Sequence, residues 1–175
     1  MHLGCGTGEG SFIFAEKADY VLGLDDDKKM IDYASSHYIR ENLDFKPDDI
    51  RDLRISDDFL FDVIVCFSLP QTLPAAAVLV DQVVKWLKPE GLFIVSSPNK
   101  FYTISLECAS SIRGFSFEEF KSFLSEYFND VYFLGEGVFP AANIFPITDK
   151  NDKPLEILVE KTEAGFSQVA PELKR

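Results

Sequence analysis

Short apolar runs alternate along this chain with longer segments in which apolar residues recur at every third or fourth position. The run from 61 to 67 is almost continuous, as in a strand that is buried on both faces of a parallel sheet. Segments with the three-to-four spacing are typical of helices that bury one side. The pattern predicts strands at 20–24, 43–45, 61–67, 92–96, 130–134 and 155–160. It predicts helices at 10–17, 27–40, 74–88 and from 116 to about 128.

Helix caps and stops mark several of these boundaries. Asp27 stands at an N-cap position, and Ser116 with Glu119 further along forms a capping-box pattern. The Pro-Glu-Gly sequence at 89–91 is expected to end the helix before it. In the last predicted helix we expect a core stripe, made by Phe117, Phe120, Leu124 and Phe128.

Strands that alternate with helices predict an α/β fold, with a doubly wound and mostly parallel sheet. The final two predicted strands, 130–134 and 155–160, have no helix between them, so we expect an antiparallel final strand at one edge. Ligands of such sheets bind beyond the carboxyl ends of the strands. Candidate ligand-binding residues follow three of the predicted strands, namely Gly4, Asp25 and Asp49.

Alternating glycines, Gly4, Gly6 and Gly8, follow the first apolar residues. Glycine adopts positive φ without strain and has no Cβ, so such a turn lets a ligand approach the backbone. The dinucleotide fingerprint needs a glycine where this chain has Glu9 or Ser11, which disfavours a nicotinamide-dependent oxidoreductase. No Gly-Lys-Ser/Thr sequence is present, which excludes a P-loop. A ligand-binding turn and a plain tight turn both remain open from the glycines alone.

Composition and charge narrow the function classes. The 175 residues are 46% hydrophobic, which predicts one globular domain, 1–163, and a polar C-terminal tail, 164–175. A net charge of −12 without a basic run predicts no nucleic-acid partner. The three cysteines lack zinc spacing, so we expect no metal and interpret Cys66 as a core thiol. The sequence shows no signal-peptide or membrane-spanning pattern, so we expect a cytoplasmic protein without membrane contact.

Five segments in order resemble the class I S-adenosylmethionine-dependent methyltransferases, over a stretch from Leu3 to about Lys161. They are the glycine turn at 3–8, the strand and helix start at 21–34, the acidic turn at 49–53, the strand at 61–65 and the turn at 87–92. The resemblance implies a Rossmann-like methyltransferase fold with S-adenosylmethionine as the cofactor.

The resemblance also implies a set of cofactor-binding residues. The methionine part of the cofactor is expected against the glycine turn, formed by Gly4, Cys5, Gly6 and Gly8. Asp25 ends a strand beside this turn, and its carboxylate can accept hydrogen bonds from both ribose hydroxyls. Asp49 is expected to accept from the adenine amino group while the backbone N–H of Ile50 donates to the ring. Asp26 and Phe67 complete the expected site, although the family usually has an apolar residue in place of Asp26.

Two of these positions leave alternatives open. His2 stands where the family usually carries Asp or Glu, tied to the ammonium group of the cofactor. A neutral histidine can accept one hydrogen bond there, whereas a charged one would repel the ammonium. A buried histidine whose hydrogen bonds are satisfied within the protein is an equally good interpretation. Asp49 is open in a similar way, because a residue shortly after Pro47 can also serve a turn.

The sequence gives fewer indications of the residues that bind the methyl acceptor. Methyl transfer needs an acceptor in line with the activated sulfonium, and a base only if that acceptor must lose a proton. No base stands out in the sequence. Gln71, after the fourth strand, is a candidate to orient the acceptor, with a plain polar loop residue as the alternative. The segments 97–99 and 115–120 resemble the small-molecule branch of the family, in which Phe101 and Tyr102 would be pocket walls.

These observations predict S-adenosylmethionine-dependent methyl transfer to a small molecule, with oxygen favoured over nitrogen or carbon. The alternative is a catalytically inactive relative that only binds the cofactor, or an N-terminally truncated fragment. Only residues 1–3 precede the glycine turn, about 10 Å of strand at ~3.3 Å per residue. The family normally has residues before this point, so we expect an N-terminally short chain in which an upstream extension would tighten cofactor binding.

Overall fold

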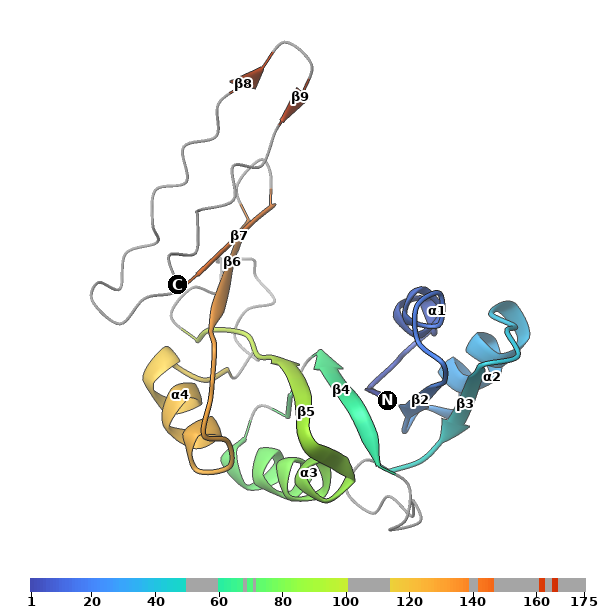
Figure 1. Ribbon diagram of the computed structural model, residues 1–175, viewed down its shortest axis with the longest axis horizontal. Coiled ribbons are helices and arrows are strands. Elements are labelled where there is room, and N and C mark those ends of the chain that lie inside the picture. The colour runs from blue at the N-terminus through green and yellow to red at the C-terminus, as the bar shows by residue number, and fades with distance from the viewer. Residues whose placement is uncertain are drawn as a thin grey trace. The chain divides into compact units, whose positions relative to one another are not determined.

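A computed structural model describes residues 1–49, 60–67, 69–70, 72–100, 114–138, 142–146, 161–162 and 165–166. The chain divides into two compact units, Met1–Asn129 and Asp130–Arg175 (Figure 1). The first unit contains the parallel sheet and all the helices that the described residues form.

The sheet of the first unit has five strands, hydrogen-bonded in the order β3-β2-β1-β4-β5, and every neighbouring pair is parallel. The strands are β1 (His2–Leu3), β2 (Val21–Asp25), β3 (Leu43–Pro47), β4 (Phe61–Phe67) and β5 (Leu87–Ser96). From β1 the chain moves outward to β3 and then returns to the other side of β1 to form β4. The direction of winding therefore reverses between β1 and β4, where ligands of open α/β sheets bind.

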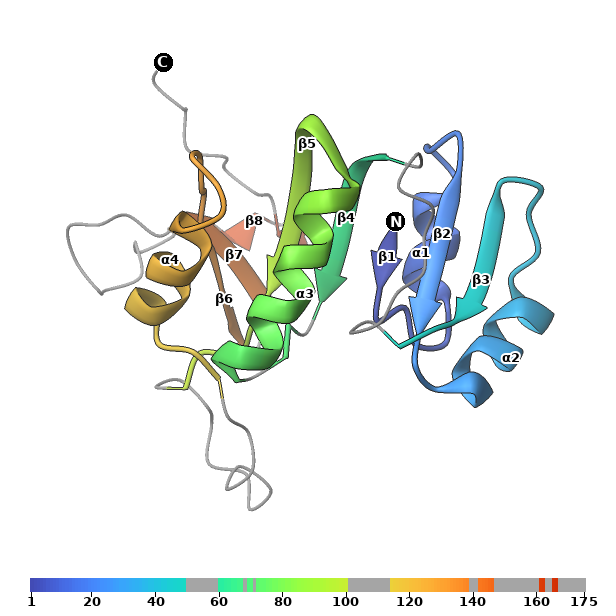
Figure 2. The ribbon, with the colours of Figure 1, turned by 90° about the horizontal axis from the view of Figure 1, so that it is seen from below.

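Helices lie on both faces of this sheet, as the predicted doubly wound fold requires. They are α1 (Glu9–Phe14), α2 (Lys28–His37), α3 (Leu73–Trp86) and α4 (Phe117–Ser125). Figures 1 and 2 show α1 and α2 on one face and α3 on the other. The predicted fold class is thus confirmed for the parallel part of the chain.

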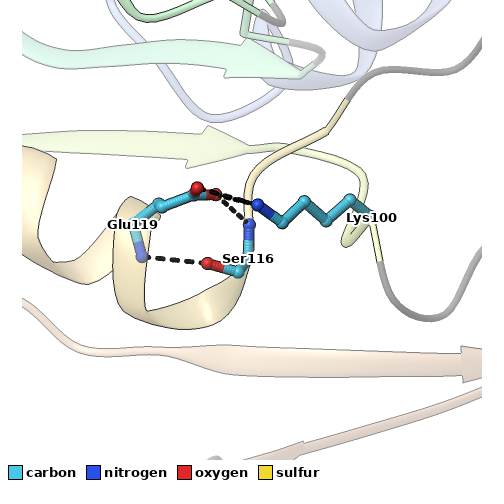
Figure 3. Close-up of polar contacts among 3 residues, drawn as sticks. All are labelled: Lys100, Ser116 and Glu119. Carbon is cyan, nitrogen blue, oxygen red and sulfur yellow. Dashed lines mark hydrogen bonds and ion pairs between the residues drawn. The ribbon is translucent and has the colours of Figure 1, made fainter.

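Both predicted helix caps are present. The Asp27 side chain accepts a hydrogen bond from the backbone N–H of Lys29 at 2.8 Å. The Ser116 hydroxyl accepts from the N–H of Glu119 at 3.2 Å, and the Glu119 carboxylate accepts from the N–H of Ser116 at 2.8 Å. The same carboxylate pairs with the Lys100 ammonium at 2.7 Å, which ties the start of α4 to the segment after β5 (Figure 3). These local signals are confirmed because a cap depends only on residues within one turn.

The prediction that β4 is buried on both faces holds only in part, because the face that carries α1 is buried at Phe61 and Val65 but exposed at Val63 and Phe67. Ile64 and Cys66 are buried on the face that α3 covers. On the opposite face the side chains of Val63 and Phe67 are 40% and 49% exposed. On β5, Leu92 pairs with Val63 and is 55% exposed, and Ile94 pairs with the buried Val65 and is 40% exposed. In the described part of the chain, α1 and α2 cover only the β1–β3 half of this face.

The core stripe of α4 is also shifted from the predicted one. Phe123 and Leu124 are buried, whereas Phe117, Phe120 and Phe128 are half-buried. Phe115, just before the helix, stacks on Phe123 with a centroid distance of 6.2 Å. This contact turns Phe123 toward the core. The boundary before β5 differs as well, because α3 ends at Trp86 and the strand already includes the predicted 89–91 stop.

The second unit contains two small antiparallel pairs. β6 (Leu134–Val138) pairs with β7 (Ala142–Pro146), and β8 (Lys161–Thr162) pairs with β9 (Gly165–Phe166). The sequence prediction placed the antiparallel partners at 130–134 and 155–160, and this is wrong for the first strand, which begins at Leu134. Residues 155–160 lie outside the described residues.

The antiparallel β6–β7 pair has a simple physical reason. Only residues 139–141 separate the two strands, and so short a connection joins antiparallel neighbours. Among the described residues, β6 and β7 form a separate two-stranded sheet that is not hydrogen-bonded to the five-stranded parallel sheet. The predicted domain boundary between 163 and 164 stays a prediction. In the described part of the chain, no helix has the length and apolar character to span a membrane.

Candidate cofactor site

The glycine turn joins β1 to α1 in a conformation that only glycine adopts without strain. Gly4, Gly6 and Gly8 have φ values of 66°, 53° and 90°. A Cβ built on Gly4 or Gly6 would have no heavy atom within 4 Å. A Cβ on Gly8 would lie 2.7 Å from the Cβ of Ala34 and 2.8 Å from the ring of Phe45. Gly4 and Gly6 therefore face open space where a ligand can approach, whereas Gly8 is required by packing.

Backbone hydrogen bonds hold this turn against the end of β2. The N–H of Cys5 donates to the carbonyl of Leu24 at 3.0 Å, and the N–H of Gly6 donates to the Asp25 carboxylate at 2.8 Å. The second Asp25 oxygen accepts from the N–H of Asp27 at 3.0 Å. Each carboxylate oxygen has a further lone pair, so the half-buried Asp25 can still accept hydrogen bonds from a ligand.

The strand register brings the other predicted residues to the same edge. Leu3 pairs with both Leu24 and Cys66, so the glycine turn, Asp25 and Phe67 all lie just beyond or at the ends of neighbouring strands. The N–H of Asp48 donates to the carbonyl of Asp25 at 3.0 Å, which continues the pairing of β2 with β3.

Asp49 and Asp26 also lie at this edge. Asp49, directly after Asp48, is half-buried, and Asp26 is exposed. Their roles toward a cofactor stay predictions. Ile50, Gln71, Phe101 and Tyr102 lie outside the described residues.

His2 is a buried and hydrogen-bonded histidine. Its Nδ1 shares a hydrogen bond of 2.8 Å with the hydroxyl of Ser11, and its ring lies edge-on to Phe14 and Phe67. Burial, together with the nearby amino terminus, lowers the pKa of His2 to about 4, although the Asp25 carboxylate acts in the opposite direction. The ring is therefore neutral at pH 7. His2 thus has a hydrogen bond within the protein, and its role toward the cofactor stays a prediction.

Ser11 is the site residue that the sequence prediction missed. It is fully buried, although serine is usually exposed. One signal was available, because Ser11 lies one helical turn before the buried Ala15 and so on the same side of the segment. A polar residue on the buried side of a helix needs a hydrogen-bond partner, and that partner is His2.

The two cysteines near this edge are unsuited to nucleophilic chemistry. Both Cys5 and Cys66 are buried. Burial raises the pKa of the Cys66 thiol to about 11, and burial with the nearby Asp25 charge raises that of Cys5 to about 12. Thiols with these pKa values stay protonated at neutral pH. The interpretation of Cys66 as a core thiol is confirmed, and the described residues contain no cluster of side chains suited to a metal ion.

Comparison with known proteins decides the family of the chain. Residues 1–95 match the family model described as a methyltransferase domain, which is more than half of the chain.

The chain belongs to this methyltransferase-domain family.

The sequence resemblance is thereby confirmed, and S-adenosylmethionine is the cofactor named for its relatives. A probable S-adenosylmethionine-dependent methyltransferase of Mycolicibacterium smegmatis is 32% identical over 100 residues, which cover 57% of this chain and 38% of that protein. A ubiquinone biosynthesis O-methyltransferase of Xylella fastidiosa is 29% identical over 102 residues, covering 57% of this chain and 42% of that protein. The chain thus spans about two fifths of the length of these curated relatives.

Solved structures support the fold of this methyltransferase domain. The plantazolicin methyltransferase BpumL, solved with a pentazolic desmethylPZN analogue and S-adenosylhomocysteine, matches with a TM-score of 0.61 and 21% identity over 78% of this chain and 59% of its own. The N-methyltransferase NodS of Bradyrhizobium japonicum matches with a TM-score of 0.60 and 19% identity, over 78% of this chain and 72% of its own. At these identities the matches show a shared fold.

The described residues of this methyltransferase domain fit S-adenosylmethionine. The cofactor carries two ribose hydroxyls, and Asp25 offers free lone pairs on both carboxylate oxygens beside the turn. The open space at Gly4 and Gly6 lets a ligand lie against the backbone. The glycine turn follows β1, which borders the reversal point between β1 and β4, and Asp25 ends the adjacent strand β2.

Proposed function

We propose that this chain is the cofactor-binding part of an S-adenosylmethionine-dependent methyltransferase that acts on a small molecule. One observation carries the proposal: the open side of Gly4 and Gly6 lies beside the half-buried Asp25 carboxylate. A plain tight turn needs neither the open space nor a carboxylate with spare lone pairs. The family membership of residues 1–95 supports the same function.

In this proposal the residues of the strand edge bind and orient the cofactor. Asp25 accepts hydrogen bonds from the ribose hydroxyls, and the backbone of Gly4 and Gly6 lies against the methionine part. Asp49 and the backbone N–H of Ile50 bind the adenine, with Asp26 and Phe67 at the border of the site. When bound, the cofactor supplies an activated methyl group on a positively charged sulfur.

The described residues around the turn supply no general base. His2 is the nearest candidate, but its Nδ1 is engaged by Ser11 and its pKa is lowered to about 4, mainly by burial. Catalysis in this part of the protein therefore rests on holding the donor in place for an in-line acceptor. We assign acceptor binding to Gln71, Phe101 and Tyr102, which stay predictions from the sequence.

For the acceptor atom we propose oxygen. The ubiquinone biosynthesis O-methyltransferase of Xylella fastidiosa supports this choice by its 29% identity. The sequence also lacks the Asn/Asp-Pro-Pro-aromatic signature of enzymes that methylate exocyclic amines. A net charge of −12 supports a small molecule over a nucleic acid. The unpaired Cys5 and Cys66 support a cytoplasmic location.

Two experiments test this function in sequence. Isothermal titration calorimetry with S-adenosylmethionine, S-adenosylhomocysteine and NAD comes first, and we expect binding of the first two ligands only. Incubation with S-adenosylmethionine carrying a ¹³C-methyl group and a metabolite extract follows. NMR of the labelled product then distinguishes an O-methyl from an N-methyl group. Binding of NAD without S-adenosylmethionine would overturn the proposal, and cofactor binding without any labelled product would favour the binding-only relative.

A further inference from the structure

His2 and Ser11 flank the glycine turn on its two sides. His2 lies on β1, Ser11 lies in α1, and their side chains share a hydrogen bond of 2.8 Å beneath the turn. They are 5% and 0% exposed. The bond therefore connects the strand that enters the turn with the helix that leaves it, out of reach of competing water.

Neighbouring residues pack closely around the side chains of His2 and Ser11. A Cβ on Gly10 would lie 3.0 Å from the His2 ring, and a Cβ on Gly23 would lie 3.0 Å from the Ser11 hydroxyl. The His2 ring also lies edge-on to Phe14 and Phe67, at centroid distances of 5.3 Å and 6.1 Å. Two glycines and two aromatic rings thus fix where the imidazole and the hydroxyl can be.

Backbone hydrogen bonds from Cys5 to the Leu24 carbonyl and from Gly6 to the Asp25 carboxylate hold the turn against β2, and the outer side of the turn is otherwise open. A Cβ on Gly4 or on Gly6 would meet no heavy atom within 4 Å. Inside the turn, the N–H of Gly8 donates to the carbonyl of Cys5 at 3.0 Å. This bond fixes the curvature of the turn but does not attach α1 to β1. The side-chain bond between His2 and Ser11 makes that attachment directly.

We propose that the His2–Ser11 pair is a positioning device that holds the glycine turn in its cofactor-binding conformation. The pair acts through the backbone and does not touch the cofactor. The proposal rests on the cofactor site proposed above, and it assigns roles to two residues beyond that site. A neutral imidazole suits this task because one ring nitrogen can be matched to a hydroxyl without burying a charge.

Three substitutions separate hydrogen bonding from packing. Ser11→Ala removes the hydroxyl, which bonds to His2 and also interacts with the Cys5 thiol. His2→Phe keeps an aromatic ring against Phe14 but removes the hydrogen bond, whereas His2→Asn loses the ring and keeps a polar atom at the position of Nδ1. Ser36→Ala is a matched control, because Ser36 makes a similar 2.9 Å bond to His37 on the exposed surface of α2.

Each variant is measured in two ways, at a temperature well below its unfolding midpoint. Calorimetry gives the Kd for S-adenosylhomocysteine, and hydrogen exchange of the unliganded protein gives the protection of the peptide covering Cys5–Gly8. We expect Ser11→Ala and His2→Phe to weaken binding about tenfold, or about 1.4 kcal/mol, and to speed exchange in the turn. His2→Asn should stay within about threefold of the wild type, and Ser36→Ala should change neither quantity.

Unchanged binding and unchanged exchange in Ser11→Ala and His2→Phe would show that the pair is ordinary core packing and overturn the proposal. The same conclusion follows if His2→Asn is impaired as much as His2→Phe, because the ring would then matter more than the bond. Failure of the wild type to bind S-adenosylhomocysteine would instead contradict the proposed function, and the exchange measurement would still decide the positioning role. If His2→Phe does not fold, Ser11→Ala carries the test because it removes a single oxygen.

Discussion

The two halves of the parallel sheet differ on the face that carries α1 (Figure 2). Over β1, β2 and β3 this face is closed by α1 and α2, with Gly8 and Gly23 allowing close approach. Over β4 and β5 the same face exposes Val63, Phe67, Leu92 and Ile94, although Val65 on this face is buried. The first half contains the glycine turn and Asp25. The difference indicates that the described residues of the candidate cofactor site belong to the covered half, whereas the β4–β5 half keeps apolar side chains exposed.

The largest expected effect comes from a substitution in the β1–β3 half of the sheet, which α1 and α2 cover. Gly8→Ala places a methyl group 2.7 Å from Ala34 and puts alanine at a φ of 90°. We expect a loss of about 3 kcal/mol in the free energy of unfolding, measured by urea denaturation, from backbone strain and overpacking together.

Gly4→Ala is the control for this substitution. It has a similar positive φ of 66° but meets no atom within 4 Å, so strain alone should cost about 1 kcal/mol. Equal losses for Gly4→Ala and Gly8→Ala would contradict the contrast between an open and a packed side of the turn.

The second expected effect is a pH dependence of the free energy of unfolding that arises from His2 in the β1–β3 half of the sheet. The pKa of His2 is about 4 in the folded protein against an ordinary value of 6.5. As the pH falls from 6.5 to 4, the unfolded chain takes up a proton at His2 while the folded protein does not. Its contribution to stability is therefore complete above pH 6.5 and lost toward pH 4, and amounts to about 2–3 kcal/mol.

Urea denaturation at several pH values checks this expectation. His2→Asn has no titrating group at the position, so its free energy of unfolding should fall less over the same pH range. Parallel pH profiles for the wild type and His2→Asn would show that His2 titrates alike in the folded and unfolded states.

The smallest expected effect comes from substitutions in the β4–β5 half of the sheet, on the face that carries α1. Leu92 and Ile94 are largely exposed, so Leu92→Ser and Ile94→Thr should each change the free energy of unfolding by only about 0.5 kcal/mol. Ile64→Ala on the buried side of β4 is the contrasting variant, with an expected loss of about 2–5 kcal/mol. A loss above about 1.5 kcal/mol for Leu92→Ser would mean that this face is covered in the folded protein.

Features that depend on neighbouring residues in the chain could be predicted from the sequence. The run at 61–67 is β4 to the residue, and the caps at Asp27 and Ser116 form as expected. The meeting of the glycine turn with Asp25 was also predictable, because parallel strands bring their carboxyl ends to one edge.

Features that depend on distant partners could not be predicted in the same way. An apolar run shows that a strand suits a buried sheet but not whether a helix covers it, and Val63 and Phe67 are exposed for that reason. The His2–Ser11 bond needed the relative placement of β1 and α1. The β6–β7 pair lies mostly between the strands predicted at 130–134 and 155–160, where the sequence predicted no strand.

The central claim is that Asp25, beside the glycine turn, binds the ribose of S-adenosylmethionine. The most direct test is calorimetric titration of S-adenosylhomocysteine into the wild type and Asp25→Ala, with Asp62→Ala as the control because the Asp62 carboxylate is exposed and pairs with Lys88. Loss of a buried acceptor for two hydroxyls should weaken binding by about 1–3 kcal/mol, or roughly five- to 150-fold, with no change for Asp62→Ala. A Kd for Asp25→Ala equal to that of the wild type would contradict the claim and mean that other residues hold the ribose.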